Sequence, residues 1–238
     1  MGLSIAVFVP EGVVIACDGL AEIHNNKNDQ GFLHKMQKRL FVFNDRYLVN
    51  IHGDGFIKGL PCAYYVNKIF KKLMQKQYDN TECFSTDFNN EFKKHVDSDE
   101  RQSFYVVGLE QVDADSVPFV LLNENGNNMR INYGNDNNIV YNYHTVGRSI
   151  WVNKLLLPTS YEISDSEKMD FESVDIDFSK YSIGDAVDFS KTFISLTKKL
   201  DELVQLKQMV GENITYGILT LDGKARLFEE SHNSSFIL

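Results

Sequence analysis

The sequence predicts an α+β fold in which two antiparallel sheets lie between layers of helices. Two β-hairpins come first, over residues 5–18 and 39–51, with apolar residues along both arms of each. Two long amphipathic stretches, over residues 56–76 and 182–208, each predict a helix with one buried face. Hairpins followed by helices are the order expected when sheets lie between helical layers. A chain of 238 residues, 43% of them hydrophobic, is long enough to bury such a core as a single domain over residues 1–238.

The opening hairpin places one carboxylate at the end of an apolar strand. Residues 5–9 and 13–17 are apolar, Pro10-Glu11-Gly12 forms the turn, and Asp18 ends the second arm. A buried carboxylate is costly unless a cation or hydrogen-bond donors meet it. Two interpretations of Asp18 stay open: it belongs to a functional site, or it begins a turn and bonds its own backbone.

The second hairpin follows a polar loop at residues 19–30. Its arms, residues 39–43 and 47–51, flank Asn44-Asp45-Arg46, and apolar residues alternate in both. Residues 56–76 then repeat apolar side chains at spacings of three and four opposite a row of lysines. This periodicity predicts a helix packed on the sheet.

A shorter helix is predicted over residues 86–96, because Ser85 or Thr86 can serve as its N-cap. Alternating apolar residues predict further strands at residues 103–108, 118–122, 129–133 and 139–146. Residues 149–157 are predicted to form a short helix ended by Pro158.

The acidic segment at residues 161–181 has weak periodicity and is predicted to be a loop or an insertion, over about 158–181. Ser182-Ile183-Gly184-Asp185 then caps the longest helix, which reaches Gln208. A closing hairpin is predicted near the end of the chain, with arms at residues 214–221 and 225–229 around Asp222-Gly223.

Composition excludes several classes of function. The net charge of −9 and the pI near 5.1 disfavour a sequence-independent grip on nucleic acid or on an anionic membrane. No stretch approaches the ~18 continuous apolar residues of a membrane helix. The scattered histidines and the absence of a Gly-rich phosphate loop predict no metal and no cofactor. The sequence has three cysteines: Cys17, Cys62 and Cys83. They lack the spacing of a zinc site or a disulfide framework, which predicts that the protein is located in a reducing cytoplasm.

Three segments together resemble the proteasome β-subunit family of N-terminal nucleophile (Ntn) hydrolases, including bacterial proteasome-related proteins such as Anbu. Residues 12–19 resemble its second strand, which ends in Ala-x-Asp, and residues 38–45 resemble its lysine-containing third strand and turn. Residues 210–214 with 221–223 resemble its late loop, strand and Asp-Gly turn. The resemblance implies a four-layer α-β-β-α sandwich and rings of subunits. It also implies an N-terminal threonine whose hydroxyl attacks the peptide carbonyl while its own amine acts as base.

The nucleophile expected from this resemblance is missing. Counting back from Asp18 in the family's register reaches Gly2, which has no side chain. Removal of Met1, which is expected before glycine, would leave an amine with no nucleophile beside it. The family's strand lysine falls at Arg39, with Lys38 on the opposite face of the strand. Because a buried carboxylate needs a partner, we expect Arg39 to reach Asp18 next to Gly2.

The other expected partners are also altered. The family's second aspartate falls near Lys207, and the second glycine of its late loop is Glu212. The serine expected after Val-Gly is displaced, because Arg148 stands between Gly147 and Ser149. The resemblance therefore predicts the frame of an active site with its catalytic groups largely replaced.

Two alternatives would restore a nucleophile. Cleavage after Leu3 would expose Ser4, but it shortens the separation from Asp18 by two residues, about 6.6 Å of strand. Cys17 lies beside Asp18, yet it continues an apolar strand, and buried cysteines are commonly structural.

These departures predict a protein with a structural, binding or assembly role rather than a threonine-type peptidase. The resemblance implies that the protein forms a homo-oligomer with other copies of the same chain, in a ring. It also implies a peptide or protein ligand. The alternative is an active peptidase or amidase of the same family that uses a processed Ser4 or another nucleophile.

Overall fold

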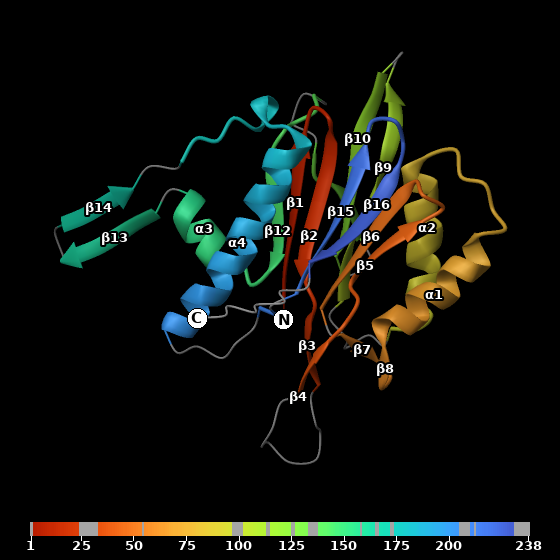
Figure 1. Ribbon diagram of the computed structural model, residues 1–238, viewed down its shortest axis with the longest axis horizontal. Helices are drawn as coiled ribbons and strands as arrows, with labels where there is room; N and C mark the ends of the chain where they lie inside the picture. Colours follow the sequence, from red (N-terminus) through yellow and green to blue (C-terminus); the bar gives the residue numbers. More distant parts are fainter. Residues whose placement is uncertain are drawn as a thin grey trace, which may run out of the picture.

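The computed structural model describes residues 2–23, 33–53, 55–96, 102–112, 115–124, 127–132, 138–157, 159–164, 167–171, 174–204, 210–211 and 213–230. Two five-stranded antiparallel sheets lie face to face, with helices on their outer sides (Figure 1). The first sheet has the order β12 (Tyr143–Gly147), β1 (Leu3–Val9), β2 (Gly12–Asp18), β15 (Ile214–Thr220), β16 (Ala225–Glu230). The second has the order β11 (Asn127–Arg130), β10 (Asp115–Glu124), β9 (Gln102–Val112), β6 (Tyr47–Gly53), β5 (Leu40–Phe43).

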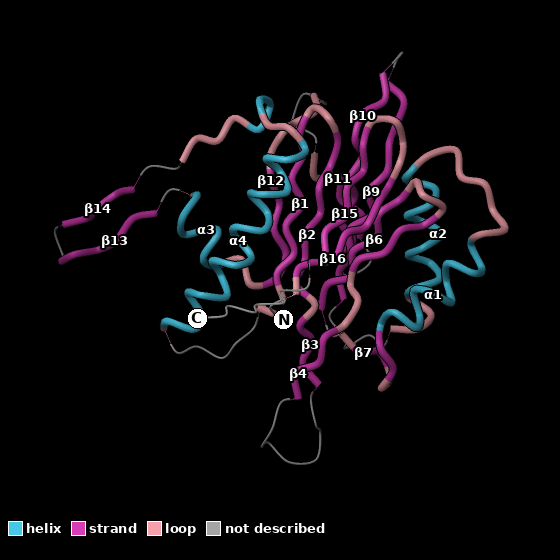
Figure 2. The backbone as a smooth tube through the Cα atoms, in the orientation of Figure 1, coloured by secondary structure: helices cyan, strands magenta, loops and turns pink. Residues whose placement is uncertain are grey.

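Four layers result, and the predicted α-β-β-α sandwich is confirmed. Helices α3 (Ile150–Leu156) and α4 (Ile183–Leu203) cover the first sheet, whereas α1 (Cys62–Leu73) and α2 (Thr81–Phe92) cover the second (Figure 2). Along β1, Leu3, Ile5 and Val7 pack toward the α4 layer, and Ala6 and Phe8 pack between the sheets. Both faces of β1 are buried, which explains why every residue of the strand except Ser4 is apolar.

The first helix starts six residues later than predicted, because the chain first forms a short hairpin of β7 (Phe56–Ile57) and β8 (Leu60–Pro61). Its turn holds Lys58 and Gly59 at positive φ, 49° and 79°. Pro61 occupies the N-cap, where its lack of an N–H costs no helical hydrogen bond.

The second helix starts five residues earlier than predicted. Asn80 is the N-cap, and its side-chain oxygen accepts a hydrogen bond of 2.8 Å from the Cys83 N–H. Asparagine caps helices as well as serine does, so neither Ser85 nor Thr86 is needed. The earlier start adds Phe84 to the buried face of α2, which also carries Phe88 and Phe92.

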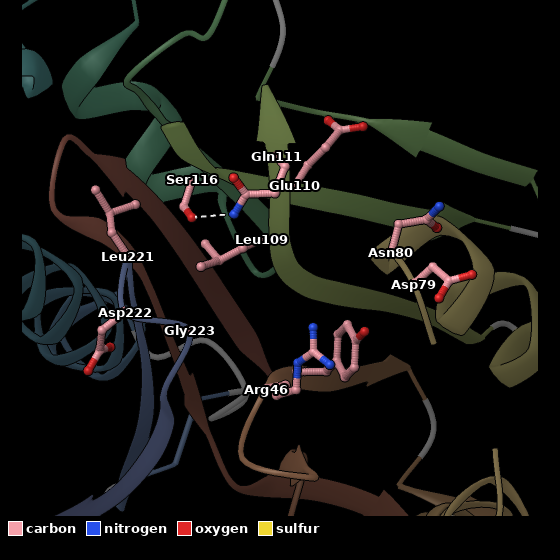
Figure 3. A pocket seen from close by; sticks show the side chains of 11 residues that line it. Arg46, Asp79, Asn80, Leu109, Glu110, Gln111, Ser116, Leu221, Asp222 and Gly223 are labelled. Atoms are coloured by element: carbon pink, nitrogen blue, oxygen red, sulfur yellow. Dashed lines mark hydrogen bonds between the residues drawn. The ribbon is translucent and has the colours of Figure 1, made fainter. Parts of the chain in front are cut away.

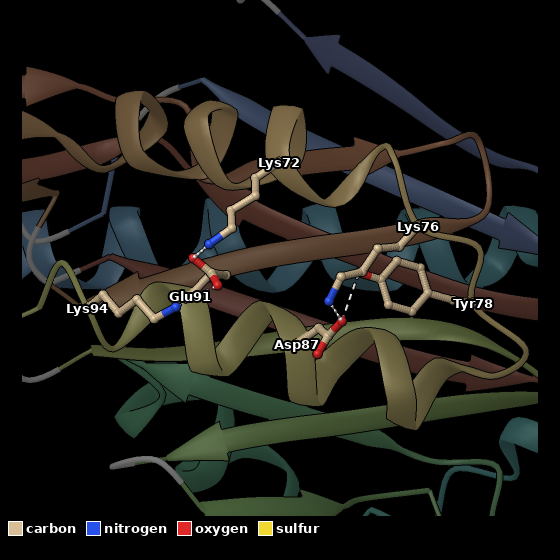
Figure 4. A network of polar contacts seen from close by, with 6 residues as sticks. All are labelled: Lys72, Lys76, Tyr78, Asp87, Glu91 and Lys94. Atoms are coloured by element: carbon tan, nitrogen blue, oxygen red, sulfur yellow. Dashed lines mark hydrogen bonds and ion pairs between the residues drawn. The ribbon is translucent and has the colours of Figure 1, made fainter.

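Ion pairs join the exposed sides of α1 and α2 (Figure 4). Glu91 accepts from Lys72 at 2.7 Å and from Lys94 at 2.6 Å, and Asp87 accepts from Lys76 at 2.6 Å. The hydrogen bonds from Lys72 and Lys94 hold the pKa of Glu91 at about 2. The lysine row predicted for the first helix therefore faces solvent and α2, as its spacing indicated.

Several strands differ from their predicted bounds because pairing continues beyond the apolar runs. Strands β9 and β10 pair from Ser103 opposite Glu124 to Val112 opposite Asp115, so their polar ends extend past residues 103–108 and 118–122. Strand β11 ends at Arg130, whereas the predicted strand ran over residues 129–133. Strand β12 begins at Tyr143, whereas the predicted strand ran over residues 139–146. The polar loop predicted at residues 19–30 begins with a strand, β3 (Leu20–Ile23), which pairs with β4 (Leu33–Met36).

The acidic segment is not a simple loop. It contains an antiparallel hairpin of β13 (Thr159–Ser164) and β14 (Glu167–Phe171), which extends away from the sheets in Figure 1, and a 3₁₀ turn at Phe178–Lys180. Apolar residues alternate weakly with acidic ones along both strands, which is why the pattern was too faint to predict them.

The last elements follow the prediction. Ser182 and Asp185 form a capping box, with the Ser182 Oγ accepting from the Asp185 N–H at 3.2 Å. Helix α4 ends at Leu203 with Val204 as its C-cap, and the rest of the predicted helix, residues 205–208, lies outside the described residues. Strands β15 and β16 form the predicted closing hairpin. Within the described ranges, no helix is long and apolar enough to cross a membrane.

Candidate functional site

Gly2, Asp18 and Arg39 lie near one another at one end of the sandwich, where β1 begins and β2 and β12 end. Strand β1 pairs with β2 so that Ser4 is opposite Cys17, and with β12 so that Leu3 is opposite Gly147. This register brings Gly2 beside Asp18.

Asp18 connects three segments that are distant in sequence. Its carboxylate is fully buried, and Oδ1 accepts a hydrogen bond of 2.6 Å from the Leu3 N–H. Oδ2 accepts from the N–H groups of Leu20, at 3.0 Å, and Gly211, at 2.7 Å. The bond to Leu20 is the local turn that one interpretation predicted, and the other two bonds make Asp18 a long-range anchor as well.

Burial raises the pKa of the Asp18 carboxyl above its ordinary value, and the Arg39 charge and the three N–H groups oppose this shift.

Arg39 is buried near this carboxylate but does not form the predicted contact with it. Its Nη2 donates a hydrogen bond of 2.6 Å to the Leu20 carbonyl oxygen, and 3% of the residue is exposed. Three backbone donors already bind the Asp18 oxygens, so the guanidinium bonds the neighbouring carbonyl and acts on the carboxyl at longer range. Lys38 is exposed, with its Nζ 5.7 Å from the centre of the Phe41 ring.

Gly2 has no room for a side chain. A Cβ atom built on Gly2 would lie 2.2 Å from Asp18 Oδ1, far inside any contact that real Cβ atoms make. The Gly2 carbonyl oxygen accepts a hydrogen bond of 3.0 Å from the Arg148 N–H, which fixes the peptide in this position. The carboxylate thus occupies the space where a side chain of residue 2 would begin.

Gly147 allows the central loop to approach this peptide. Its φ of 96° is in the left-handed region, and a Cβ there would lie 2.1 Å from the Gly2 carbonyl oxygen and 2.3 Å from His52 Cε1. Any other residue would separate the loop from both groups.

Solved structures share this architecture. No protein-family model and no curated protein sequence matches the chain. A structure of Anbu from Hyphomicrobium sp. strain MC1, described as a Gly-1 mutant, is 14% identical over 99% of this chain and 91% of its own, with a TM-score of 0.61. Anbu from Yersinia bercovieri, described as an ancestral beta-subunit, is 13% identical over 97% of this chain and 88% of its own, with a TM-score of 0.60. The chain has the fold of Anbu. The resemblance predicted from the sequence is therefore confirmed for the fold.

On this Anbu fold, the side chains of Ser149 and Arg148 bond to residues other than Gly2 and Asp18. Ser149 precedes α3, and its Oγ accepts a hydrogen bond of 3.5 Å from Asn153 rather than bonding Gly2 or Asp18. The Arg148 side chain turns toward α4, where its Nη2 lies 3.1 Å from the fully buried Asp201 carboxylate. Lys207 and Glu212 lie outside the described residues.

The two alternative nucleophiles are buried between the sheets of the Anbu fold. Cys17 belongs to the apolar core there, and burial raises the pKa of its thiol to about 12, so it is neutral. Ser4 is 1% exposed, and its Oγ has no hydrogen-bond partner among the described residues. Both positions agree with a structural interpretation better than with a nucleophile reached from solvent.

His52 is a site residue that the sequence prediction missed. It is 5% exposed, it lies against Gly147, and its Nδ1 has no hydrogen-bond partner within the described part of the chain. The predicted strand ended at Ile51, but β6 continues to Gly53. Extending the alternation by one residue would have placed Leu48, Asn50 and His52 on one face, which was the available signal.

The buried His52 should make the stability of this Anbu-like fold depend on pH. Burial, and next the Arg39 charge, lower its pKa from 6.5 to about 3, so the folded state keeps the ring neutral while the unfolded chain takes up a proton. The stability that comes from keeping the His52 ring neutral is fully present above pH 6.5 and is lost as the pH falls toward 3. We expect a loss of about 2 kcal/mol between pH 6.5 and 4.5, measured by urea unfolding. His52→Gln should remove most of this slope. His95, beyond the end of α2, also has a lowered pKa because of burial, but its ring is more exposed than that of His52, so His95→Gln should remove a smaller part of the slope. Equal slopes in His52→Gln and the unmodified protein would contradict the assignment.

Proposed function

We propose that this chain is a proteasome-subunit-like protein whose Gly2 site does not perform threonine-type peptide hydrolysis, and that it acts through binding or assembly. The observation that carries the proposal is the 2.2 Å separation between a Cβ at residue 2 and Asp18 Oδ1. An N-terminal nucleophile needs its hydroxyl or thiol beside its own amine. Here the carboxylate occupies the space in which that side chain would begin.

The surrounding bonds support this proposal because they hold the carboxylate in place. Asp18 is a short side chain with three backbone hydrogen bonds, so it cannot move aside without leaving buried N–H groups unpaired. Arg39 is likewise bonded to the Leu20 carbonyl. Its guanidinium stays charged near neutral pH and cannot exchange protons as a lysine amine can.

The alternative of an active hydrolase using Ser4 meets two structural costs. Leu3 and Ser4 are paired on both sides, with β2 or the Asp18 carboxylate on one and with β12 on the other. Cleavage after Leu3 would remove the N–H that binds Asp18 Oδ1. The Ser4 Oγ would still lie in the core between the sheets unless the strand shifted register.

Intact mass after treatment with an electrophilic N-terminal-nucleophile inhibitor tests the proposal. We expect a chain without trimming at Ser4 and without a covalent adduct. A first residue of Ser4, or an adduct at any hydroxyl or thiol near Asp18, would overturn it. An active threonine-type peptidase treated in parallel should form the adduct, which controls the inhibitor.

We propose that copies of this chain assemble with one another into a ring. We also propose that the protein binds a peptide or protein ligand. The support is the shared fold with Anbu structures, one of which is described as a beta-subunit. Sedimentation velocity across a range of concentrations should show a species larger than 27.3 kDa. A monomer at every concentration would contradict the assembly role.

A further inference from the structure

A polar pocket lies at the end of the sandwich opposite Gly2. Its volume is about 640 Å³, within the range of small-molecule sites. Arg46 contributes from the β5–β6 turn, whereas Arg39 and His52 lie at the other ends of these two strands. The pocket is therefore separate from the region around Asp18.

Arg46 enters this pocket from a fixed backbone. The turn before it holds Asn44 and Asp45 at positive φ, 49° and 53°, a conformation typical of tight hairpin turns. The Asp45 carbonyl oxygen accepts a hydrogen bond of 2.8 Å from the Ala225 N–H, which ties the turn to β16. The guanidinium lies 5.7 Å from the centre of the Tyr47 ring.

Asp79 lies on a second wall that is also held in place (Figure 3). It precedes Asn80, whose side chain caps α2. The next residue, Thr81, donates a hydrogen bond of 3.1 Å to the Leu109 carbonyl oxygen, which joins this end of α2 to β9. The Asp79 backbone is thus fixed relative to the sheet that carries Arg46.

Arg46 and Asp79 are the charged groups of this pocket that lack an ion pair among the described residues. Glu110 pairs with Arg130 at 2.9 Å, and Asp222 lies 3.4 Å from the Lys224 Nζ. Arg46 and Asp79 do not pair with each other, yet both lie close to Tyr47. Burial raises the pKa of the Tyr47 phenol, the Arg46 charge lowers it and the Asp79 charge raises it. The pocket thus presents one cation and one anion on separate walls, with Leu109 and Leu221 as apolar lining.

We propose that this pocket binds a short zwitterionic peptide of two or three residues. Arg46 would bind the C-terminal carboxylate, since a guanidinium matches a carboxylate with two parallel donors. Asp79 would accept from the N-terminal ammonium, and the leucines would contact the side chains between them. A ligand with separated opposite charges satisfies both groups, whereas a simple anion or cation leaves one without a partner.

Isothermal titration calorimetry with trialanine on the full chain tests this assignment. We expect trialanine with free ends to bind, and its N-acetylated and C-amidated forms to bind about tenfold more weakly, because each lacks one charge-assisted bond. Failure of trialanine to bind at millimolar concentration would overturn the proposal, and so would equal affinity for all three peptides.

Two substitutions assign each end of the peptide. In Arg46→Gln the free and amidated peptides should bind equally, and in Asp79→Asn the free and acetylated peptides should bind equally. Both residues are exposed, so neither change should prevent folding. Arg226→Gln and Asp188→Asn, on exposed positions outside the pocket, are matched controls that should leave all affinities unchanged. An unaltered preference in Arg46→Gln or in Asp79→Asn would show that the peptide binds elsewhere.

Discussion

Asp18→Ala should lower the free energy of unfolding by about 5 kcal/mol, since it leaves three buried N–H groups without an acceptor at roughly 1–3 kcal/mol each. The loss should appear in urea unfolding as a lower midpoint, and the midpoint should fall less in Asp18→Asn, whose side-chain oxygen can still accept. Asp188→Ala, on the exposed side of α4, should change stability by less than about 0.5 kcal/mol.

The comparison of Asp18→Ala with Asp18→Asn also separates two roles of this residue. If the carboxylate served only a lost reaction, both substitutions should be tolerated. If it is a structural anchor between Leu3, Leu20 and Gly211, the alanine variant should be far less stable than the asparagine variant. Equal stability of the two variants and the unmodified protein would contradict the anchor. The anchor explains how Asp18 can be required in a chain whose nucleophile position is glycine.

Much of the fold could be predicted because its central strands are strongly patterned. The arms of the first two hairpins carry apolar residues at regular positions, and both were placed within a few residues. Helix starts were less predictable, because periodicity alone does not locate the N-cap residue. The N-cap of α1 is Pro61, and that of α2 is Asn80. The polar strands β4 and β14 were missed, since few apolar residues alternate along them.

Part of the candidate site could be predicted, but its hydrogen bonds could not. Gly2, Asp18 and Arg39 do lie together, yet the acceptor of the Arg39 guanidinium is a backbone carbonyl. Every residue carries a backbone N–H and C=O, so side-chain identity does not show which of them will reach a buried charge. The approach of Gly147 to Gly2 and His52 depends on strands far apart in sequence, and a pattern within one segment does not contain it.

Gly2→Thr should not create an N-terminal-nucleophile hydrolase. Threonine has the hydroxyl that the chemistry needs, but its Cβ would lie 2.2 Å from Asp18 Oδ1, so the strand end or the carboxylate must move. We expect a loss of about 3 kcal/mol in urea unfolding and no covalent adduct with an electrophilic inhibitor by intact mass.

A matched pair of alanine substitutions isolates the steric cause of that loss. Gly2→Ala adds one methyl group against the carboxylate and should destabilise the fold. Gly184→Ala, in the first turn of α4, places its methyl 3.5 Å from the Ser182 Oγ, an ordinary contact, and should stabilise the helix by about 0.5–1 kcal/mol. Opposite signs for the two changes would locate the effect in the space beside Asp18 rather than in the loss of glycine as such. If Gly2→Thr were as stable as the unmodified protein and formed the adduct, glycine alone would separate this chain from an active hydrolase, and the closed site that we infer from Asp18 would be wrong.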